Sequence, residues 1–346
     1  MSRLNKDLGL LQGVALLSTS LLGTGIFAVP ALAASVAGAA SLWAWLLLIV
    51  LVLPVAFTFA QLGRRFPHAG GAPHLIGRAF GARSERLSAM LFLAVLPVGL
   101  PAALQIATGF CQALLPLGRG AALGVQLLTL GAMLLLGRRP AGASSLVQGL
   151  IAVAILASVG LAWWAGDLPR ADQPLLPPLG DGWRQLPAAL AVMFWCFVGI
   201  EAFTHLGEEF RRPQRDFPLA LLLGVLLAGL VYWACSVAVL SFHAYGDAAR
   251  NAASLPYLLG GLLGEPARRL VALVGYLACF ASMNVYVQGF ARLIWSLADE
   301  GKLPPALARR NRHGAPARAL LLVVLSCALC AALAALLQLS VAELIR

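Results

Sequence analysis

The chain has 346 residues, of which 60% are hydrophobic and only 11% are charged, and its mean hydropathy is +0.86. These values exclude a soluble globular domain, in which about a quarter of the residues are charged, and indicate a polytopic membrane protein. The formal net charge of +11 does not indicate nucleic acid binding, because the basic residues are spread over short loops instead of forming one stripe with interleaved aromatic residues.

Nine apolar stretches are long enough to cross a hydrocarbon core of about 30 Å. We expect membrane spans near residues 10–36, 42–62, 87–114, 121–137, 144–165, 187–209, 217–241, 269–297 and 319–338. Eighteen of the 25 lysine and arginine residues then fall on the side of the N-terminus and six on the other side, with Arg346 at the C-terminus. Because basic residues concentrate in cytoplasmic loops, this bias predicts an integral membrane protein whose N-terminus is cytoplasmic.

The first and sixth spans are each interrupted near the middle, by Gly23-Thr24-Gly25 and by Phe197-Val198-Gly199. A broken span exposes backbone groups that hydrocarbon cannot satisfy, so it persists only where it lines a polar cavity or a substrate. The breaks are five spans apart, an odd number, so the two spans cross the membrane in opposite directions. This predicts an inverted repeat of five plus five spans, with a first repeat over 1–165, an external connector over 166–186 and an incomplete second repeat over 187–346.

The two breaks together suit a zwitterionic ligand. The amides of Gly23-Thr24-Gly25 lie at the start of the outer half-helix, where the helix dipole favours an anion such as an amino acid carboxylate. The opposed break leaves carbonyls near Trp195, Cys196 and Val198, which can accept hydrogen bonds from an ammonium group. The sequence therefore predicts an amino acid as the small-molecule substrate, whereas a sugar would require side-chain amides and carboxylates that these segments lack.

Glu201 is the only one of the fourteen acidic residues that lies well inside a predicted span. An ionisable residue within a membrane is costly and by default indicates function, and a carboxyl at this place can couple substrate movement to a proton. It can also serve only as a hydrogen-bonded staple for the broken helix. Both interpretations stay open from the sequence.

α-Helical spacing would place Thr204, His205 and Glu208 on the face of the helix that carries Glu201 and leads toward the cytoplasm. This arrangement predicts a role for His205 in proton coupling. The alternative is that Glu208 and Glu209 form an ordinary solvated helix end beside the arginines that follow.

Other polar residues within the spans have two interpretations. They are Gln105, Thr108 and Gln112 in the third span and Ser282, Asn284 and Gln288 in the eighth. Each can line the cavity or join helices by hydrogen bonds. Between spans, the basic, turn-rich segment 64–71 predicts a short interfacial element, and the apolar stretch 255–263 predicts a short helix that partly plugs the outer mouth.

A membrane enzyme is a further class to weigh. An intramembrane hydrolase or metalloenzyme needs Asp, Glu and His clustered at one depth, whereas the five histidines are scattered along the sequence. The spacing Cys327-x-x-Cys330 is typical of a metal or redox motif, but it lies in an alanine and leucine run without a second pair. We therefore expect no enzymatic activity, no cofactor and no metal site.

Four motifs resemble the amino acid, polyamine and organocation (APC) transporter superfamily. They are Gly23-Thr-Gly-Ile-Phe27, Phe66-Pro-His-Ala-Gly-Gly71, Trp195-Cys-Phe-Val-Gly-Ile-Glu201 and Glu208-Glu-Phe-Arg-Arg-Pro-Gln-Arg-Asp-Phe-Pro218. Further matches are spread over nearly every span, which hydrophobic composition alone does not produce.

The resemblance implies a LeuT-type fold, in which the amides of Gly23-Thr24-Gly25 hold the substrate carboxylate and the carbonyls of Leu21, Trp195 and Val198 hold the amine. It also implies that Trp195 acts as an inner aromatic gate and that Glu201 takes part in proton coupling. The implied function is export of neutral amino acids (L-methionine, leucine, isoleucine and valine) across a bacterial inner membrane by proton antiport.

The chain departs from this family in two respects. Span five contains no lysine, where some proton-coupled members have one. The family has at least ten spans, whereas this chain ends at Leu344-Ile345-Arg346, just after span nine, so the resemblance implies a C-terminally truncated product that lacks span ten onward. An importer of the same fold, a sensor that binds an amino acid without moving it, and assembly into a homo-oligomer are left open.

Overall fold

The computed structural model describes residues 5–338, apart from 24, 116, 140, 169–175 and 177–179. The helices that build the spans are α1 (Leu10–Leu22), α2 (Gly25–Ala37), α3 (Ser41–Arg65), α5 (Ala82–Ala94), α6 (Leu96–Leu114), α7 (Arg119–Gly137), α8 (Ala141–Ala165), α9 (Leu186–Phe194), α10 (Ile200–Phe203), α11 (Asp216–Ser241), α14 (Glu265–Asp299) and α15 (Ala317–Leu336). Shorter elements connect them: η1 (Gly38–Ala40), α4 (Gly71–Phe80), η3 (Gly180–Gln185), η4 (Trp195–Phe197), η5 (Thr204–Glu209), α12 (Ala248–Ala252), α13 (Ser254–Leu263) and η6 (Pro305–Ala308).

The predicted spans are helical in the structure. Eight segments of the described residues are long and apolar enough to cross a membrane. The number differs from the predicted nine because α2 and α3 run on as one segment over Gly25–Arg65, whereas α1 alone is too short. Since α1 with α2 corresponds to the first predicted span and α3 to the second, the predicted crossing pattern is retained, and the chain is an integral membrane protein.

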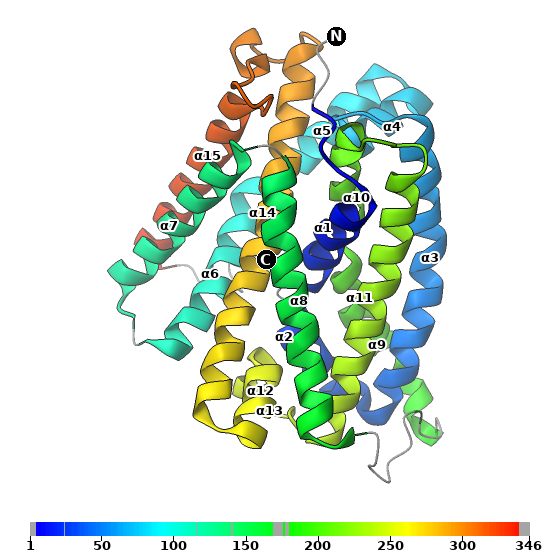
Figure 1. The fold of residues 1–346 in the computed structure, drawn as a ribbon, viewed down its shortest axis with the longest axis vertical. Coiled ribbons are helices and arrows are strands. Elements are labelled where there is room, and N and C mark those ends of the chain that lie inside the picture. The colour runs from blue at the N-terminus through cyan, green and yellow to red at the C-terminus, as the bar shows by residue number, and fades with distance from the viewer. Residues whose placement is uncertain are drawn as a thin grey trace.

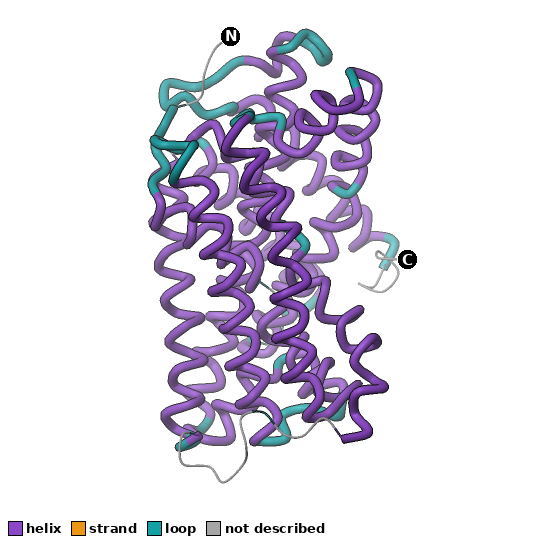
Figure 2. The backbone as a smooth tube through the Cα atoms, turned by 90° about the vertical axis from the view of Figure 1, so that its right-hand side faces the viewer, coloured by secondary structure: helices purple, strands orange, loops and turns teal. Residues whose placement is uncertain are grey.

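Most of the long helices run along the long axis of the molecule (Figures 1 and 2). The N-terminus, α4 and α5 lie at one end, which we call the N-terminal face, and α12 and α13 lie near the other end (Figure 1). The short helix predicted over 255–263 is α13, and the hydroxyl of Ser254 at its start donates to the carbonyl of Phe27 at 2.9 Å. This contact anchors α13 on α2.

The predicted connector over 166–186 contains one described helical element, η3. Residues 169–175 and 177–179 of this connector lie outside the described part of the chain. The division into repeats over 1–165 and 187–346 therefore stays a prediction.

Polar side chains join α1, α8 and α14 inside the bundle. Gln148 of α8 accepts a hydrogen bond from the hydroxyl of Thr19 in α1 at 2.5 Å and donates to a backbone carbonyl of α14 at 2.9 Å. Asn284 and Gln288 of α14 both donate to the hydroxyl of Ser144 in α8, at 3.0 and 2.8 Å. Of the two interpretations open for Asn284 and Gln288, the structure therefore supports helix joining.

The helices α3 and α11 pack closely along their length. The indole N–H of Trp45 donates to the hydroxyl of Ser236 at 2.6 Å, and its ring stacks on that of Tyr232 with 4.6 Å between centroids. Near the N-terminal face, a Cβ on Gly63 would lie 2.2 Å from the ring of Phe217. Because glycine has no side chain there, the two helices can approach each other, and α11 is held beside the first break.

Glu209 is buried, so the alternative prediction of a solvated helix end was wrong for this residue. Its carboxylate forms an ion pair with the guanidinium of Arg292 in α14, which also donates to the backbone carbonyl of Gln288. The backbone carbonyl of Glu209 accepts a hydrogen bond from the N–H of Leu8 at 3.0 Å. A buried ion pair and a backbone contact thus hold the N-terminal segment, the end of span six and α14 together.

Replacing Arg292 with methionine is expected to lower the free energy of unfolding by about 3–5 kcal/mol, because it leaves the buried carboxylate of Glu209 without a counter-charge. The double variant Glu209→Leu/Arg292→Met should recover most of the loss, since apolar side chains of similar volume can replace a buried ion pair. Thermal unfolding of both variants in detergent measures this. If the single and the double variant were equally destabilised, the loss of stability would come from altered packing and not from the unpaired charge of Glu209.

Candidate functional site

A cavity of about 250 Å³ lies between the two broken spans. Nine residues of these spans line it: Ser20, Leu21, Gly25, Trp195, Cys196, Val198, Glu201, Ala202 and His205. Most of the residues predicted to bind substrate or a proton therefore lie around one cavity. Gly23 and Gly199 belong to the breaks without being among its lining residues, and Thr24 lies outside the described residues.

The rest of the cavity wall is largely apolar. It includes Phe92, Val95, Leu100, Ala103, Met283 and Phe290, from α5, α6 and α14 and the junction between α5 and α6. The sequence could not identify these residues, because an apolar side chain in a span can face lipid, another helix or a cavity. Trp195 also lines the cavity and is 62% exposed, and its role as a gate stays a prediction.

The carbonyls at the end of α1 are held by side chains of two other spans. A helix leaves its last four carbonyls without intrahelical partners. The hydroxyl of Ser282 in α14 donates to the carbonyl of Ser20 at 2.9 Å, and the hydroxyl of Tyr232 in α11 donates to those of Leu21 and Leu22, at 2.8 and 3.2 Å. These contacts explain how the first break is maintained inside a membrane. Tyr232 was missed from sequence, although a tyrosine hydroxyl in an apolar span usually needs such a partner.

The sequence predicted that the amide of Gly23 is free to bind a carboxylate, but in the structure this amide is already hydrogen-bonded. Gly23 donates its N–H to the carbonyl of Thr19 at 3.0 Å and closes the last turn of α1. Its φ is +21°, and a Cβ at this position would lie 2.7 Å from the Cβ of Ser282. Gly23 is therefore required for the close packing of the break, and the amide at the open end of α2 belongs to Gly25.

Gly25 packs against the polar centre of the site. A Cβ on this residue would lie 2.2 Å from the hydroxyl oxygen of Tyr232 and 3.2 Å from the sulfur of Cys196. Gly25 also begins α2, and the first amides of a helix have no partner within it. The site therefore needs glycine here for space, and this helix end favours an anion.

The second break lies at Val198 and Gly199, as predicted, between η4 and α10. Gly199 has a φ of +126°, which other residues rarely adopt. Its N–H donates to the carboxylate of Glu201 at 3.0 Å. The structure thus shows the stapling contact considered for Glu201 and also places this residue in the cavity wall. Its part in proton coupling stays a prediction.

The predicted α-helical face from Glu201 to Glu208 is not formed. The α-helix ends at Phe203, and η5 continues as a tighter 3₁₀-helix, in which residues three apart are eclipsed. Thr204 donates to the carbonyl of Glu201, and the carboxylate of Glu208 accepts from the N–H of Ala69 at 3.3 Å. Glu208 therefore holds the segment before α4 and is not a lining residue of the cavity.

His205 is buried beside the cavity with one defined tautomer. Its Nδ1 lies 3.0 Å from the carbonyl oxygen of Ala69, and since a carbonyl only accepts, Nδ1 carries the proton and Nε2 the lone pair. Among the described residues, Nε2 has no hydrogen-bond partner. The imidazole thus has an unused acceptor in a cavity that also contains Glu201, which is the property a proton acceptor requires.

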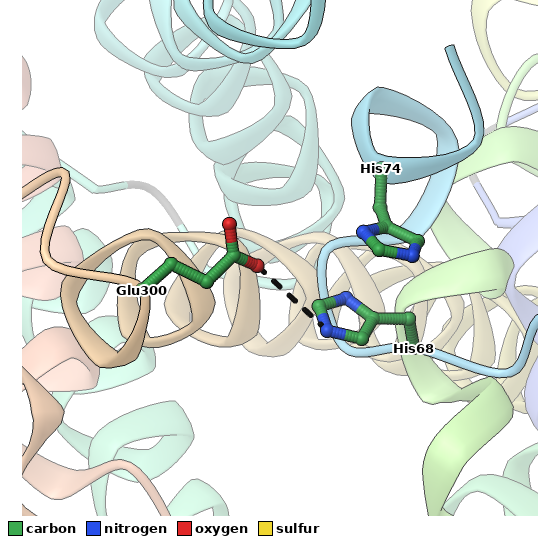
Figure 3. A group of neighbouring side chains, drawn as sticks. All are labelled: His68, His74 and Glu300. Carbon is green, nitrogen blue, oxygen red and sulfur yellow. Dashed lines mark ion pairs between the residues drawn. The ribbon is translucent and has the colours of Figure 1, made fainter. Parts of the chain in front are cut away.

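His68 and His74 were predicted to be scattered, and the structure corrects this. Their rings stack with 3.8 Å between centroids at the N-terminal face, and Nε2 of His68 lies 3.7 Å from the carboxylate of Glu300 (Figure 3). The ammonium of Lys302 contacts Glu300 at 2.5 Å and Glu85 of α5 at 2.6 Å. These residues, which we call the histidine latch, join the α4 and α5 region to the end of α14.

The latch has the residue types of a metal site, but its contacts compete with a metal ion. Ligand atoms of His68, His74 and Glu300 lie within 4.8 Å of one another. However, Lys302 already occupies the carboxylate of Glu300. The N–H of Gly70 also donates to Nδ1 of His68 at 3.1 Å, which places the ring proton on Nε2, the atom that faces Glu300.

The latch is expected to loosen on acidification. Burial lowers the pKa of His74, and His68 lowers it further, against the opposite effect of Glu85 and Glu300. When the latch opens, the pKa of His74 returns to about 6.5. As the pH falls through 6.5, the open state therefore binds a proton that the closed state does not yet bind, and the closed latch loses stability. Hydrogen exchange of the amides of α4, corrected for intrinsic rates, should show more opening at pH 5.5 than at pH 8.

His74→Gln should flatten this pH dependence, because glutamine does not titrate. Glu300 contributes in the same direction at lower pH. Burial alone would raise its pKa, but hydrogen bonding and the charge of Lys302 outweigh burial and lower it. An unchanged pH profile in the His74→Gln variant would assign the effect to Glu300 or to another group.

Comparisons with known proteins agree with this geometry. The structure of MhsT in complex with L-phenylalanine aligns with a TM-score of 0.68 at 14% identity, covering 96% of this chain and 80% of that one. A Na⁺-coupled sialic acid symporter in a substrate-bound outward-open state also has a TM-score of 0.68, at 11% identity and with 96% and 75% coverage. Two opposed, interrupted spans around a cavity, in an arrangement shared with these proteins, show that the chain has the LeuT fold.

The sequence comparisons identify the family. The family model described as amino acid permease matches residues 8–344, and the chain belongs to this family of the APC superfamily. The L-methionine/branched-chain amino acid exporter YjeH of Escherichia coli K12 is 52% identical over 327 residues, which are 94% of this chain and 78% of the exporter. The cadaverine/lysine antiporter of the same strain is 26% identical over 329 residues, covering 92% and 72%.

Proposed function

We propose that this transporter exports neutral, apolar amino acids, L-methionine, leucine, isoleucine and valine among them, in exchange for protons. The observation that carries this proposal is a single cavity in which the ends of two broken helices meet a largely apolar wall and one carboxyl group. The name of the relative with 52% identity, an L-methionine/branched-chain amino acid exporter, supports this substrate class.

The polar ends of the two breaks suit the two charges of a zwitterion. The open end of α2 at Gly25 favours the carboxylate. The carbonyls of Leu21, Trp195 and Val198 are candidates for the ammonium group, and although Leu21 already accepts from Tyr232, a carbonyl has two lone pairs. The substrate side chain then lies against the apolar wall. Among the described residues that line the cavity, Glu201 alone has a carboxyl that could compensate a cationic side chain.

Glu201 and His205 are the proposed proton carriers. Both line the cavity, so a proton on either group and a substrate in the cavity can influence each other directly. Glu201 also caps the second break through the N–H of Gly199. Protonation of this carboxylate weakens that contact, which gives a physical route from proton uptake to a change in the broken helix.

The excess of basic residues supports an orientation in which the N-terminal face is cytoplasmic. The direction of transport follows from the gradients as well as from the protein, so an importer is the principal alternative. A sensor that binds without transport is the second.

Counterflow in proteoliposomes tests these proposals. Vesicles loaded with unlabelled methionine should accumulate labelled methionine and leucine but not labelled arginine, and an imposed pH gradient should drive net methionine flux. Binding of methionine without counterflow would indicate a sensor. Accumulation of arginine would contradict the proposed substrate class.

A further inference from the structure

A polar pocket lies at the rim of the N-terminal face, separate from the central cavity. It has a volume of about 300 Å³ and is lined by Gln61, Arg64 and Arg65 at the end of α3 and by Gln214 in the loop before α11. None of these four residues lines the cavity between the breaks. In Figure 1, α3 lies at the edge of the bundle, so its outer face is available to the surrounding membrane.

The surroundings of this pocket are strongly basic. Five exposed arginines lie at the end of α3 and in the loop before α11: Arg64, Arg65, Arg211, Arg212 and Arg215. Within the described part of the chain, none of them forms an ion pair with a carboxylate. A group of like charges that are not held in ion pairs favours an anion, and the planar guanidinium matches the oxygens of a phosphate group.

Apolar side chains are exposed on both helices that adjoin the pocket. On α3, Val50 and Phe57 are 62% and 53% exposed, and they precede Arg64 by fourteen and seven residues, so the three share one side of the helix. On α11, Leu219 and Leu223 are also exposed. An occupant of this site therefore meets cations at one end and two apolar helix faces below it.

We propose that this site binds an anionic phospholipid, with the phosphate held by Arg64, Arg65 and Gln214 and the acyl chains along α3 and α11. A free phosphate would use the same cationic groups but would leave the adjoining apolar surface without a role. Basic pockets at the ends of membrane helices are favourable for lipid headgroups, with about 1 kcal/mol for each arginine or lysine near an anionic membrane surface.

Binding at this place would connect two parts of the transporter. Arg64 and Arg65 lie at the end of span two. Gln214 lies in the loop between span six and α11. This loop follows Glu209, which forms the buried ion pair with Arg292. A headgroup between them would hold the end of span two against the segment that leaves span six. We therefore expect the lipid to stabilise the protein.

Native mass spectrometry of the delipidated full chain with added dioleoylphosphatidylglycerol tests this proposal. Wild type should retain this lipid in preference to dioleoylphosphatidylcholine. The variant Arg64→Gln/Arg65→Gln should bind phosphatidylglycerol about thirtyfold more weakly, the equivalent of about 2 kcal/mol for two arginines. The matched control is Arg138→Gln/Arg139→Gln, an exposed arginine pair at the end of α7 that makes the same change in net charge.

Two results would overturn the proposal. The first is equal loss of phosphatidylglycerol in both double variants, which would show that only net charge matters. The second is displacement of the lipid by millimolar inorganic phosphate, which would assign the site to a free anion. A rise in the unfolding temperature of wild type with phosphatidylglycerol, smaller in Arg64→Gln/Arg65→Gln than in the control, would support the site independently of transport.

Discussion

Replacing Glu201 with glutamine is expected to abolish methionine flux driven by a pH gradient while largely sparing methionine exchange. Glutamine has nearly the same size, and its side-chain oxygen can still accept the hydrogen bond from the N–H of Gly199 that the carboxylate accepts at 3.0 Å. The second break should therefore keep its shape. The variant differs in that it cannot take up or release a proton, so only the coupled process is lost.

The measurement is paired uptake in proteoliposomes, with and without an imposed pH gradient. Glu201→Ala is a useful comparison, because it also removes the acceptor for Gly199 and should impair exchange as well as coupling. His205→Gln is expected to reduce coupling less completely, since it leaves Glu201, whose carboxyl links proton uptake to the second break through the N–H of Gly199. If Glu201→Gln retained normal flux in response to the pH gradient, the carboxyl would be only a structural staple.

Replacing Gly25 with alanine is expected to lower methionine binding by about tenfold to a hundredfold. The added Cβ would lie 2.2 Å from the hydroxyl oxygen of Tyr232, and this hydroxyl holds the carbonyls of Leu21 and Leu22. Relief of the clash either displaces Tyr232 or shifts the start of α2. If Tyr232 moves, a buried carbonyl loses its hydrogen-bond donor, at a cost of about 1–3 kcal/mol. If α2 shifts, its N-terminal end no longer faces the carboxylate of the substrate.

The double variant Gly25→Ala/Tyr232→Phe separates the steric cause from a general loss of stability. Phenylalanine removes the oxygen that the methyl group meets and leaves the ring carbon at 3.2 Å, so binding should recover in part compared with Gly25→Ala. Gly109→Ala is the matched control, because nothing lies within 4 Å of a Cβ at this position in α6. Methionine binding to each variant can be measured by scintillation proximity. Normal binding by Gly25→Ala would contradict the steric argument.

The spans and both breaks could be predicted because their signals are local. Hydrocarbon accepts long apolar stretches and rejects unsatisfied backbone, so Gly199 in the middle of such a stretch already indicates an interruption. The inverted pairing of the breaks also follows from counting spans. These arguments need no knowledge of which helix contacts which.

The partners of the breaks could not be predicted in the same way. Tyr232 and Ser282 reach the first break from spans seven and eight, and many polar residues in spans could have done so. The helical face proposed from Glu201 assumed regular α-helix, whereas the chain changes to a 3₁₀-helix after Phe203. The prediction from helical spacing was therefore correct in placing His205 at the cavity, but it was wrong for Glu208.

By itself, the sequence determined that this chain is a membrane protein with two opposed, interrupted spans, and it identified Glu201 as the carboxyl within them. Only the tertiary structure decided that Gly23 uses its amide within α1, that Glu209 is buried against Arg292, and that His68 stacks on His74. The reason is physical. Hydropathy and backbone flexibility are properties of a short segment, whereas a hydrogen bond or an ion pair depends on which distant segment packs beside it.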